Sequence, residues 1–554
     1  MTDVHLPAEL AQTGTRIKVE TRYGPVTGGR ALNGAATFLG IPPTNLPEIP
    51  YGLPPNRWED PLPLSSSYRY EEKEYIYENT YAAQPKNDGQ AAAIPYKDKV
   101  GLGEPSENAL FLNIVSPPDF PEKKGFPVRV YIHGGFLQFG SPHSLMSQPQ
   151  YIAAERSEVW INIGYRLSAF GFLASDEPDL HGNYGFMDQY LALEWIRDNI
   201  EAFGGDPSDI RITGLSAGAH SVHQILHHVS HLPHGVMAPF QSAVLQSNAI
   251  MTVPKTPTEL RAQYAALCTA LDLDPAAPDT LAALRDPTRT PASRITQAIE
   301  TDAVGTEHGT YRGALSAPWL PVPSAADSNT DPMTWQRSGA LAHSVRAKGV
   351  KSILLGDVPD EWYLYSIAHP IRRAADVPVN LRRYYPGELV DRMLTLWDEL
   401  PDDATAEEAA RRFGEVLCAG QVHVPVRVLH RDLVNAGFPV VRYAVRWAPE
   451  GVRPFGKLVT HGSDRCLWAF REPRLGEEGK EVARRWLDSI DQALQDIEAA
   501  GKPLRGLKEV LTLKEDRSID WSEDPRWEQD MKMAALLPGE EVSSASSKSS
   551  CVVN

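Results

Sequence analysis

The chain has 554 residues, of which 42% are hydrophobic and 23% are charged, so it has the composition of a globular protein with ample length for a large core. Its formal net charge of −17 argues against nucleic acid as a partner, because binding to phosphates requires clustered Lys and Arg side chains. No run of about 18 apolar residues occurs, so the sequence predicts no transmembrane segment.

The first residues and the cysteines indicate in which cellular compartment the protein is expected. The first residues, MTDVHLPAELAQTGTRIKVE, contain no basic start followed by an apolar core, so no secretory signal is expected. The chain has 4 cysteines and no Asn-x-Ser/Thr acceptor for N-glycosylation. Together these features favour a cytoplasmic protein.

Apolar strand-like runs alternate with longer amphipathic segments in the first half of the chain. FPVRVYIHGG predicts a buried strand from about Val128 to Ile132 that runs into a Gly-rich loop, and SEVWINIGYR predicts another strand. GFMDQYLALEWIRDNIEAFGG has apolar residues at helical spacing and predicts a helix that ends at Gly204 and Gly205. DIRITGLS then predicts a short strand, and AGAHSVHQILHHV the start of a helix. The alternation predicts an α/β protein with a mainly parallel sheet covered by helices.

The remaining segments determine the domain organisation. Residues 255–345 and 375–435 have a mostly helical pattern, richer in Ala, Pro and charge, and predict helical insertions that form a cap beside the sheet. No internal repeat and no long linker interrupts residues 1–536, which we therefore expect to form a single domain. Residues 537–554 are rich in Ser and predict a disordered tail.

One short motif indicates nucleophilic chemistry. ITGLSAGAH, residues 212–220, places Ser216 between Gly214 and Gly218. The pattern G-x-S-x-G also arises by chance, but here the serine follows a predicted strand and precedes a predicted helix, as a nucleophile elbow requires. A serine hydroxyl is a weak nucleophile, so it needs a histidine as base, an acid that orients the histidine, and donors for the oxyanion.

A Gly-rich loop upstream is a candidate for those donors. HGGFLQFG, His133 to Gly140, follows a predicted strand, and its glycines allow the amides of Gly134 and Gly135 to face a substrate oxygen. The amide of Ala217, directly after the serine, is the expected third donor. The alternative is an ordinary glycine turn.

Several segments together resemble the type-B carboxylesterase family of α/β-hydrolases, which includes the cholinesterases. The resemblance is carried by FLGIP, PPNRWEDPLPL and SENALFLNIVSP, and above all by GNYGFMDQYLALEWIRDNIEAFGGDPSDIRITGLSAG. It covers residues 17 to 535 and is strongest from 106 to 220. It implies the α/β-hydrolase fold with a cap over the active site, a serine esterase with a small-molecule ester as substrate, and no metal or cofactor.

The resemblance also implies the other two catalytic residues. ILLGDVPDEWYLYS is similar to the family's strand and loop ending in Asp-Glu-Gly and places the acid at Glu361, with Asp357 and Asp360 as competing candidates. LVTHGSDRCLWAF is similar to the His-Gly-x-Asp segment and places the base at His461. The order Ser, acid, His is that of an α/β-hydrolase. Trp362 replaces the usual Gly after the acid, so a different loop is expected there.

Departures from the family pattern narrow the range of expected substrates. Leu215 stands where relatives often carry Glu before the serine, and Ala109 replaces the cysteine of a disulfide found in secreted relatives. Residues 80–105 contain no tryptophan that could bind a quaternary ammonium group. A choline ester is therefore not the expected substrate.

Three further features have alternative interpretations. A row of histidines after the serine could be a metal site, although no H-E-x-x-H pattern is present: His220, His223, His227, His228, His231 and His234. Cys466 could line the pocket or be a buried thiol. The last residues, CVVN, have the form C-a-a-X and leave open a weak lipid anchor at Cys551.

The sequence thus predicts a serine hydrolase of carboxylic esters, in which His461, oriented by Glu361, activates Ser216. A lactonase, an amidase or an acyl transferase would use the same residues. A non-catalytic binding homologue is the alternative from another class of protein, and the survival of all three residues argues against it.

Overall fold

A computed structural model describes residues 3–540 of the chain, except 40–48, 51, 54–55, 87–94 and 324–330. Cys551 and most of the predicted tail lie outside the described residues. Within residues 537–540, the Glu540 carboxylate accepts a hydrogen bond of 2.8 Å from Arg431. Glu540 therefore contacts the packed part of the chain.

One large sheet organises the molecule. Thirteen strands of the described residues belong to it, and from β11 to β16 every neighbouring pair is parallel. The order across the sheet is β1 (Arg16–Thr21), β2 (Gly24–Arg30), β3 (Ala36–Phe38), β9 (Phe111–Ser116), β11 (Val159–Ile163), β10 (Phe126–Ile132), β12 (Gly205–Leu215), β13 (Ser242–Gln246), β14 (Ser352–Asp357), β15 (Val440–Val445), β16 (Glu509–Leu513) and β17 (Ile519–Glu523), with β4 (Ile49–Pro50) on β9. Two small sheets pair β5 (Gly52–Leu53) with β6 (Leu62–Pro63), and β7 (Thr80–Ala82) with β8 (Glu104–Ser106).

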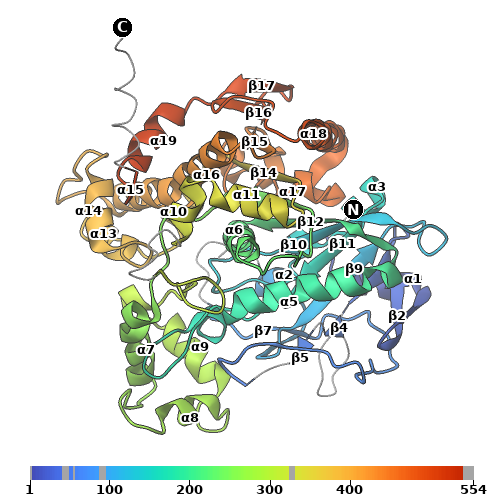
Figure 1. The fold of residues 1–554 in the computed structure, drawn as a ribbon, viewed down its shortest axis with the longest axis horizontal. Coiled ribbons are helices and arrows are strands. Elements are labelled where there is room, and N and C mark those ends of the chain that lie inside the picture. The colour runs from blue at the N-terminus through green and yellow to red at the C-terminus, as the bar shows by residue number, and fades with distance from the viewer. Residues whose placement is uncertain are drawn as a thin grey trace.

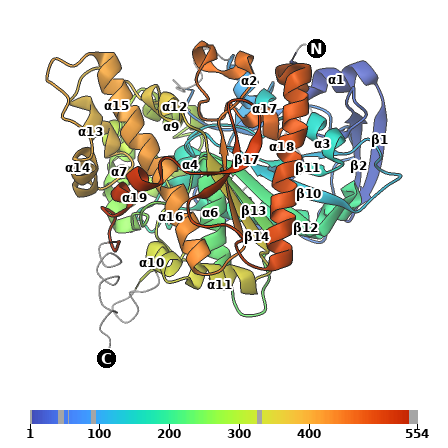
Figure 2. The same cartoon turned by 90° about the horizontal axis from the view of Figure 1, so that it is seen from above.

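Helices cover both faces of this sheet. The long helix α18 lies over the central strands in Figure 2. The first face packs against α5 (Tyr184–Asn199), α6 (Ala217–Ser230), α11 (Ala340–Ala347) and α16 (Val424–Asn435), and the opposite face against α3 (Gln150–Arg156) and α18 (Glu472–Ala500).

The strand β14 shows how one sheet builds two cores. Successive side chains of a strand point to opposite faces. Ile353 and Leu355 belong to the apolar cluster on the α5 and α6 side, whereas Leu354 between them belongs to the cluster under α18. Because both faces are buried, the strand is apolar without alternation, and the molecule has three layers of helix, sheet and helix (Figure 1).

The remaining helices lie beside or at the ends of the sheet. Figure 1 shows α7 to α9 as one group at the lower left and α13 to α15 as another at the left. These groups are α7 (Pro257–Ala270), α8 (Thr280–Arg285) and α9 (Ala292–Glu300), and α13 (Asp376–Leu381), α14 (Gly387–Leu394) and α15 (Ala406–Cys418). The others are α1 (Leu6–Thr13), α2 (Tyr96–Val100), α4 (Ser168–Phe172), α10 (Pro332–Arg337), α12 (Trp362–Ser366), α17 (Arg465–Trp468) and α19 (Trp527–Ala534).

The predicted elements agree with the structure in type and differ at their ends. The predicted strands and helices around Ser216 correspond to β10, β11, α5, β12 and α6. Helix α5 stops at Asn199, a 3₁₀ turn follows, and Gly204 ends it with a φ of 86°. Both predicted insertions are mostly helical, although α11 and α16 within them pack on the sheet side with α6.

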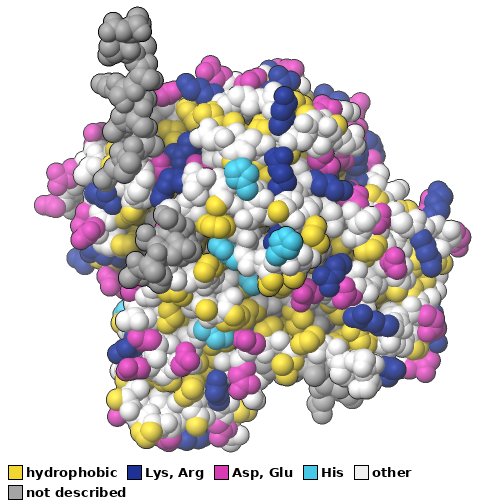
Figure 3. All heavy atoms as spheres, viewed as in Figure 1, with side chains coloured by type: hydrophobic (Ala, Val, Ile, Leu, Met, Phe, Trp, Pro, Cys, Tyr) yellow, Lys and Arg dark blue, Asp and Glu magenta, His cyan; other side chains and the backbone are white. Residues whose placement is uncertain are grey.

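The surface and the helix lengths give two further facts. On the face shown in Figure 3, acidic and basic side chains are interspersed. No helix within the described residues combines the length and the apolar character needed to cross a membrane.

Candidate active site

Ser216 occupies a sharp turn between β12 and α6. Its φ of 61° and ψ of −126° are far from the values of either element, and a serine rarely adopts a positive φ. The backbone N–H of Ser216 donates to the Gln246 carbonyl on β13 at 2.8 Å, so the neighbouring strand holds the turn. Strain maintained in this way concentrates at functional sites.

The flanking glycines permit the turn because no side chain fits there. A Cβ at Gly214 would lie 2.1 Å from the carbonyl atoms of Gly218, and one at Gly218 would lie 2.0 Å from the Ile132 oxygen. Neither glycine has a positive φ, so close approach of backbones rather than conformational freedom requires them. This explains the spacing in G-x-S-x-G.

The glycine loop after β10 lies against the serine. A Cβ at Gly134 would come within 2.9 Å of the Ser216 Cβ, and Gly135 has a φ of 114°. The Gln138 side chain fixes the far end of the loop, because its Nε2 donates to the carbonyls of Phe136 at 2.9 Å and Tyr311 at 2.5 Å. Both predicted loop glycines are thus beside the serine.

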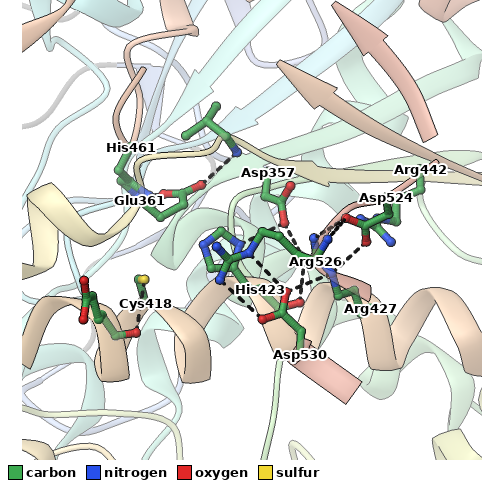
Figure 4. Close-up of polar contacts among 12 residues, drawn as sticks. Asp357, Glu361, Cys418, His423, Arg427, Arg442, His461, Asp524, Arg526 and Asp530 are labelled. Atoms are coloured by element: carbon green, nitrogen blue, oxygen red, sulfur yellow. Dashed lines mark hydrogen bonds and ion pairs between the residues drawn. The ribbon is translucent and has the colours of Figure 1, made fainter. Parts of the chain in front are cut away.

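His461 and Glu361 are in direct contact. The distance from His461 Nδ1 to Glu361 Oε2 is 2.5 Å, and Glu361 is fully buried. The other carboxylate oxygen accepts a hydrogen bond from the Val358 N–H at 3.2 Å. The outer nitrogen of His461, Nε2, is buried and has no hydrogen-bond partner among the described residues. Figure 4 shows this pair apart from the other charged groups nearby.

Asp360 joins the two loops that carry this pair. Its carboxylate accepts a hydrogen bond from the Val459 N–H at 3.0 Å, and its own N–H donates to the Val459 carbonyl at 3.1 Å. Asp360 directly precedes Glu361 in the chain. Its two hydrogen bonds connect it to Val459, which lies two residues before His461. It positions the pair and does not contact the histidine.

Asp357, the other competing acid, faces a different set of partners. Its Oδ2 accepts hydrogen bonds from Arg427 at 2.7 Å and from His423 at 3.1 Å. Arg427 also donates to both carboxylate oxygens of Asp524, at 2.9 and 3.0 Å (Figure 4). Burial raises the pKa of Asp357, but the Arg427 charge, the His423 hydrogen bond and charge, and the Arg442 charge together outweigh it and hold the pKa below the usual range. Of the three acids, the structure brings Glu361 to His461.

A cavity of about 440 Å³ opens over the serine. Ser216, His461, Gly134 and Gly135 all line it, together with Leu215. Ala217 does not line this cavity and instead borders a second, much smaller one that also touches Ser216. The serine and the histidine therefore border the same cavity.

Trp362, which replaces the family's glycine, begins helix α12 directly after Glu361. Its ring lies under the Arg411 guanidinium, 3.4 Å from the carbon of that group. Trp362 therefore belongs to a short helix, α12, that packs against α15.

Asp464, in the His-Gly-x-Asp segment, is a titratable neighbour of Glu361 and His461 for which the sequence predicted no role. It is buried, its Oδ2 accepts a hydrogen bond from Trp468 at 2.9 Å, and its Oδ1 has no partner among the described residues. Burial raises the pKa of Asp464 to about 6. No motif could have indicated this shift, which depends on packing around α17.

Cys466 and three histidines of the row, His220, His223 and His227, are buried, whereas His228 and His231 are half-buried and His234 is exposed. Burial lowers the pKa of His223 to about 3, and it also lowers those of His220 and His227. The described part of the chain contains no group of three His, Cys, Asp or Glu side chains that could hold a metal ion. Burial raises the pKa of the Cys466 thiol to about 12, and this residue does not line the large cavity.

The chain is similar to known proteins along most of its length. A model described as "Carboxylesterase family" matches residues 15–350, which include Ser216 and the glycine loop but neither Glu361 nor His461. An uncharacterised esterase/lipase of Schizosaccharomyces pombe is 28% identical over 522 residues, covering 89% of this chain and 91% of that protein. A carboxylic ester hydrolase of Gibberella moniliformis is 28% identical over 525 residues, covering 88% and 91%. A solved structure of PNB esterase superposes with a TM-score of 0.70 at 22% identity, over 94% of this chain and 100% of that one.

Proposed function

The chain belongs to the carboxylesterase family and has the α/β-hydrolase fold, and on this premise we propose that it is a serine esterase that hydrolyses carboxylic esters through an acyl-enzyme. The observation that carries the proposal is the common cavity of Ser216 and His461, in which the histidine has an unpaired Nε2 and a buried carboxylate on its other nitrogen.

In the proposed first step, His461 Nε2 takes the hydroxyl proton of Ser216 as Oγ attacks the ester carbonyl. Glu361 accepts a hydrogen bond from Nδ1–H, which fixes the tautomer with a free Nε2 and stabilises the imidazolium that forms. His461 then donates the proton to the departing alcohol. Water, activated by the same nitrogen, attacks the acyl-enzyme and releases the acid.

The proposed oxyanion donors are the backbone amides of Gly134, Gly135 and Ala217. Support comes from the close approach of the glycine loop to Ser216 and from the position of Ala217 at the first residue of α6, where backbone N–H groups have no helical partner. Donors fixed before the reaction stabilise the negative charge that develops in the transition state. This chemistry requires no metal and no cofactor.

We propose a single domain for residues 1–536, with the helical groups α7–α9 and α13–α15 as its insertions. In support, the apolar cluster on the α5 face contains residues from β1 to β15 and from α7. The α13–α15 group belongs to a second apolar cluster, which also contains Phe136 of the glycine loop and Val428 of α16, so this insertion does not pack apart from the rest of the chain.

The test is hydrolysis of p-nitrophenyl esters from acetate to laurate by the wild type, by Ser216→Ala and by Ser208→Ala. Ser208 is an exposed serine on the same strand β12 and serves as the matched control. We expect Ser216→Ala to lose turnover by at least about 10⁴-fold and Ser208→Ala to match the wild type. Intact mass after rapid quenching should show an acyl group on the wild type. Full activity of Ser216→Ala, or no activity of the wild type on any ester, would contradict the proposal.

A further inference from the structure

Two cavities meet at Ser216, and their chemistry differs. The large cavity of about 440 Å³ contains His461. A second cavity of about 10 Å³ is bordered by Ser216 and Ala217 and also by Arg312. The inference that follows concerns the second cavity, and it rests on the proposed esterase function.

The proposed mechanism assigns one half of the substrate to each cavity. The departing alcohol receives its proton from His461, so its oxygen must lie in the large cavity, which His461 lines. His461 does not border the small cavity within the described residues. The acyl group, which stays on Ser216 after the alcohol has left, can then extend into the small cavity, which Arg312 borders.

Arg312 carries a positive charge that the protein does not neutralise locally. Within the described residues it has no carboxylate partner. Its contacts are a long hydrogen bond of 3.5 Å to Gln421 and the ring of Tyr384, 5.4 Å from the guanidinium carbon. A guanidinium presents several N–H donors in one plane, and its best complement is a carboxylate.

Two buried polar atoms of the residues that border the small cavity have no hydrogen-bond partner in the described part of the chain. Nδ1 of His220 and Oδ1 of Asn248 are buried and have no partner among the described residues, and these side chains are 8% and 4% exposed. Burying a polar group without a hydrogen bond is unfavourable, so a hydrocarbon chain in this place would leave both atoms unpaired and give Arg312 no further partner. A carboxylate at the end of the acyl group would accept hydrogen bonds from Arg312 and, in the Nδ1–H tautomer, from His220, whereas Asn248 Oδ1 is itself an acceptor and would not pair with it.

Arg312 is also held in place relative to the glycine loop. Gln138 accepts a hydrogen bond from the Tyr311 N–H at 3.0 Å, and its Nε2 donates to the Tyr311 carbonyl. The residue before Arg312 is therefore bonded on both sides to the loop that approaches Ser216. A charge on a fixed segment can select a substrate group at a defined distance from the ester.

The space beyond the small cavity continues into a larger one. His220, Arg312 and Gln421 border both the small cavity and a cavity of about 300 Å³. Arg382 and Arg383 also line the larger one, but they lie 3.4 Å from Asp391 and 3.6 Å from Asp302. The narrow part has room for about one water molecule, so it excludes a branched acyl group.

We propose that the preferred substrates are half-esters of short dicarboxylic acids, with the free carboxylate of the acyl group bound by Arg312. Hydrolysis adds one water across the ester bond and yields the alcohol and the dicarboxylic acid. Arg312 is a specificity-determining residue in this assignment and takes no part in proton transfer.

The test compares two ethyl esters of nearly the same shape. Monoethyl succinate carries the carboxylate, and ethyl succinamate has a neutral amide in its place; ethanol release gives kcat/KM for each at pH 7. We expect the wild type to prefer the anionic ester, and Arg312→Gln to lower the anionic-to-neutral ratio by about 10- to 100-fold. Arg312→Lys should retain part of the ratio. Arg197→Gln, an arginine of α5 that lines neither cavity and pairs with Asp198, is the matched control and should leave the ratio unchanged.

Each outcome separates this inference from the proposed function. If the wild type hydrolyses neither these esters nor p-nitrophenyl acetate, the esterase proposal fails and the inference fails with it. If the wild type hydrolyses p-nitrophenyl acetate but does not prefer monoethyl succinate, the inference alone is wrong. A loss in Arg312→Gln that is equal for both ethyl esters also overturns it, because such a loss reflects general damage and not charge recognition.

Discussion

Asp357 and Glu361 are four residues apart at the end of the same strand, yet they belong to two unlike regions. Glu361 contacts one histidine, and the far nitrogen of that histidine is unpaired and borders a cavity. Asp357 contacts Arg427 and His423, and Arg427 in turn pairs with Asp524 and Asp530. Three aspartates and the three arginines Arg427, Arg442 and Arg526 make up this closed network.

The difference shows that the partner, rather than the carboxylate, decides what a buried acid can do. A carboxylate paired with arginine has a partner that cannot lose its proton, so the pair serves only to fix structure. A carboxylate paired with histidine has a partner that exchanges a proton near neutral pH. We therefore expect substitutions in the two regions to separate activity from stability.

The largest expected effect is on turnover. Glu361→Gln keeps the size of the side chain but removes the charge that orients His461, so kcat should fall by about 10³- to 10⁴-fold. Urea unfolding followed by tryptophan fluorescence should change little in comparison. If Glu361→Gln were as active as the wild type, the assignment of the acid would be wrong.

Asp357→Asn should have the opposite pattern. It leaves the Arg427 charge short of one partner in the interior, and the unfolding free energy should fall by about 3 kcal/mol while kcat changes only a few-fold. Asp119→Asn is the matched control, because Asp119 pairs with Lys123 at the surface and should have almost no effect. A large loss of kcat in a stable Asp357→Asn protein would contradict the separation.

The pH dependence of this loss follows from the sign of the shift. The Asp357 pKa is lowered in the folded protein, so its contribution to stability is present above the unfolded value of about 3.9 and is lost as the pH falls below it. The difference in stability between wild type and Asp357→Asn should therefore shrink at acid pH. A difference that grows below pH 4 would contradict the lowered pKa.

Asp464 should behave in the reverse manner. Its pKa is raised by burial to about 6, so the folded protein loses stability from this group as the pH rises from about 4 through about 6. Asp464→Asn should increase the unfolding free energy at pH 8 by up to about 3 kcal/mol and have little effect at pH 4. Urea unfolding at both pH values measures this, and destabilisation at pH 8 would contradict it.

The smallest expected effect lies at the link between the loops. Asp360→Ala removes the hydrogen bond to the Val459 N–H, which should lower stability by about 1 kcal/mol and kcat by several-fold, with KM nearly unchanged. Asp516→Ala, which removes a comparable carboxylate–backbone hydrogen bond to Ser518 at the exposed turn between β16 and β17, is the control and should leave kcat unchanged. An unchanged kcat in Asp360→Ala would mean that the loops hold the pair without it.

The local structure around Ser216 could be predicted from the sequence because the elements there are consecutive. The strand, the turn and the helix around Ser216 each have a local pattern, and only the exact ends differ in the structure. The choice among Asp357, Asp360 and Glu361 came from family resemblance alone, since it depends on which acid meets a histidine 100 residues later in the chain.

The role proposed for Arg312 could not be predicted from the sequence, for a different reason. An arginine is significant in a cavity when no carboxylate neutralises it, and this is a property of the packed chain rather than of any motif. Arg382 and Arg383, which line the same larger cavity, are each near an aspartate. Their sequence context gives no sign of the distinction.

The distribution of the site along the chain has a consequence for synthesis. Ser216 and the glycine loop lie in the first half, whereas Glu361 and His461 follow much later and are joined by the Asp360–Val459 bonds. During translation Ser216 is therefore made long before His461. The turn at Ser216 can form while the nascent chain still lacks the proposed catalytic base. Under the proposed mechanism the growing polypeptide has no hydrolytic activity until the segment around His461 has emerged from the ribosome and docked, so acquisition of activity marks the completion of the fold.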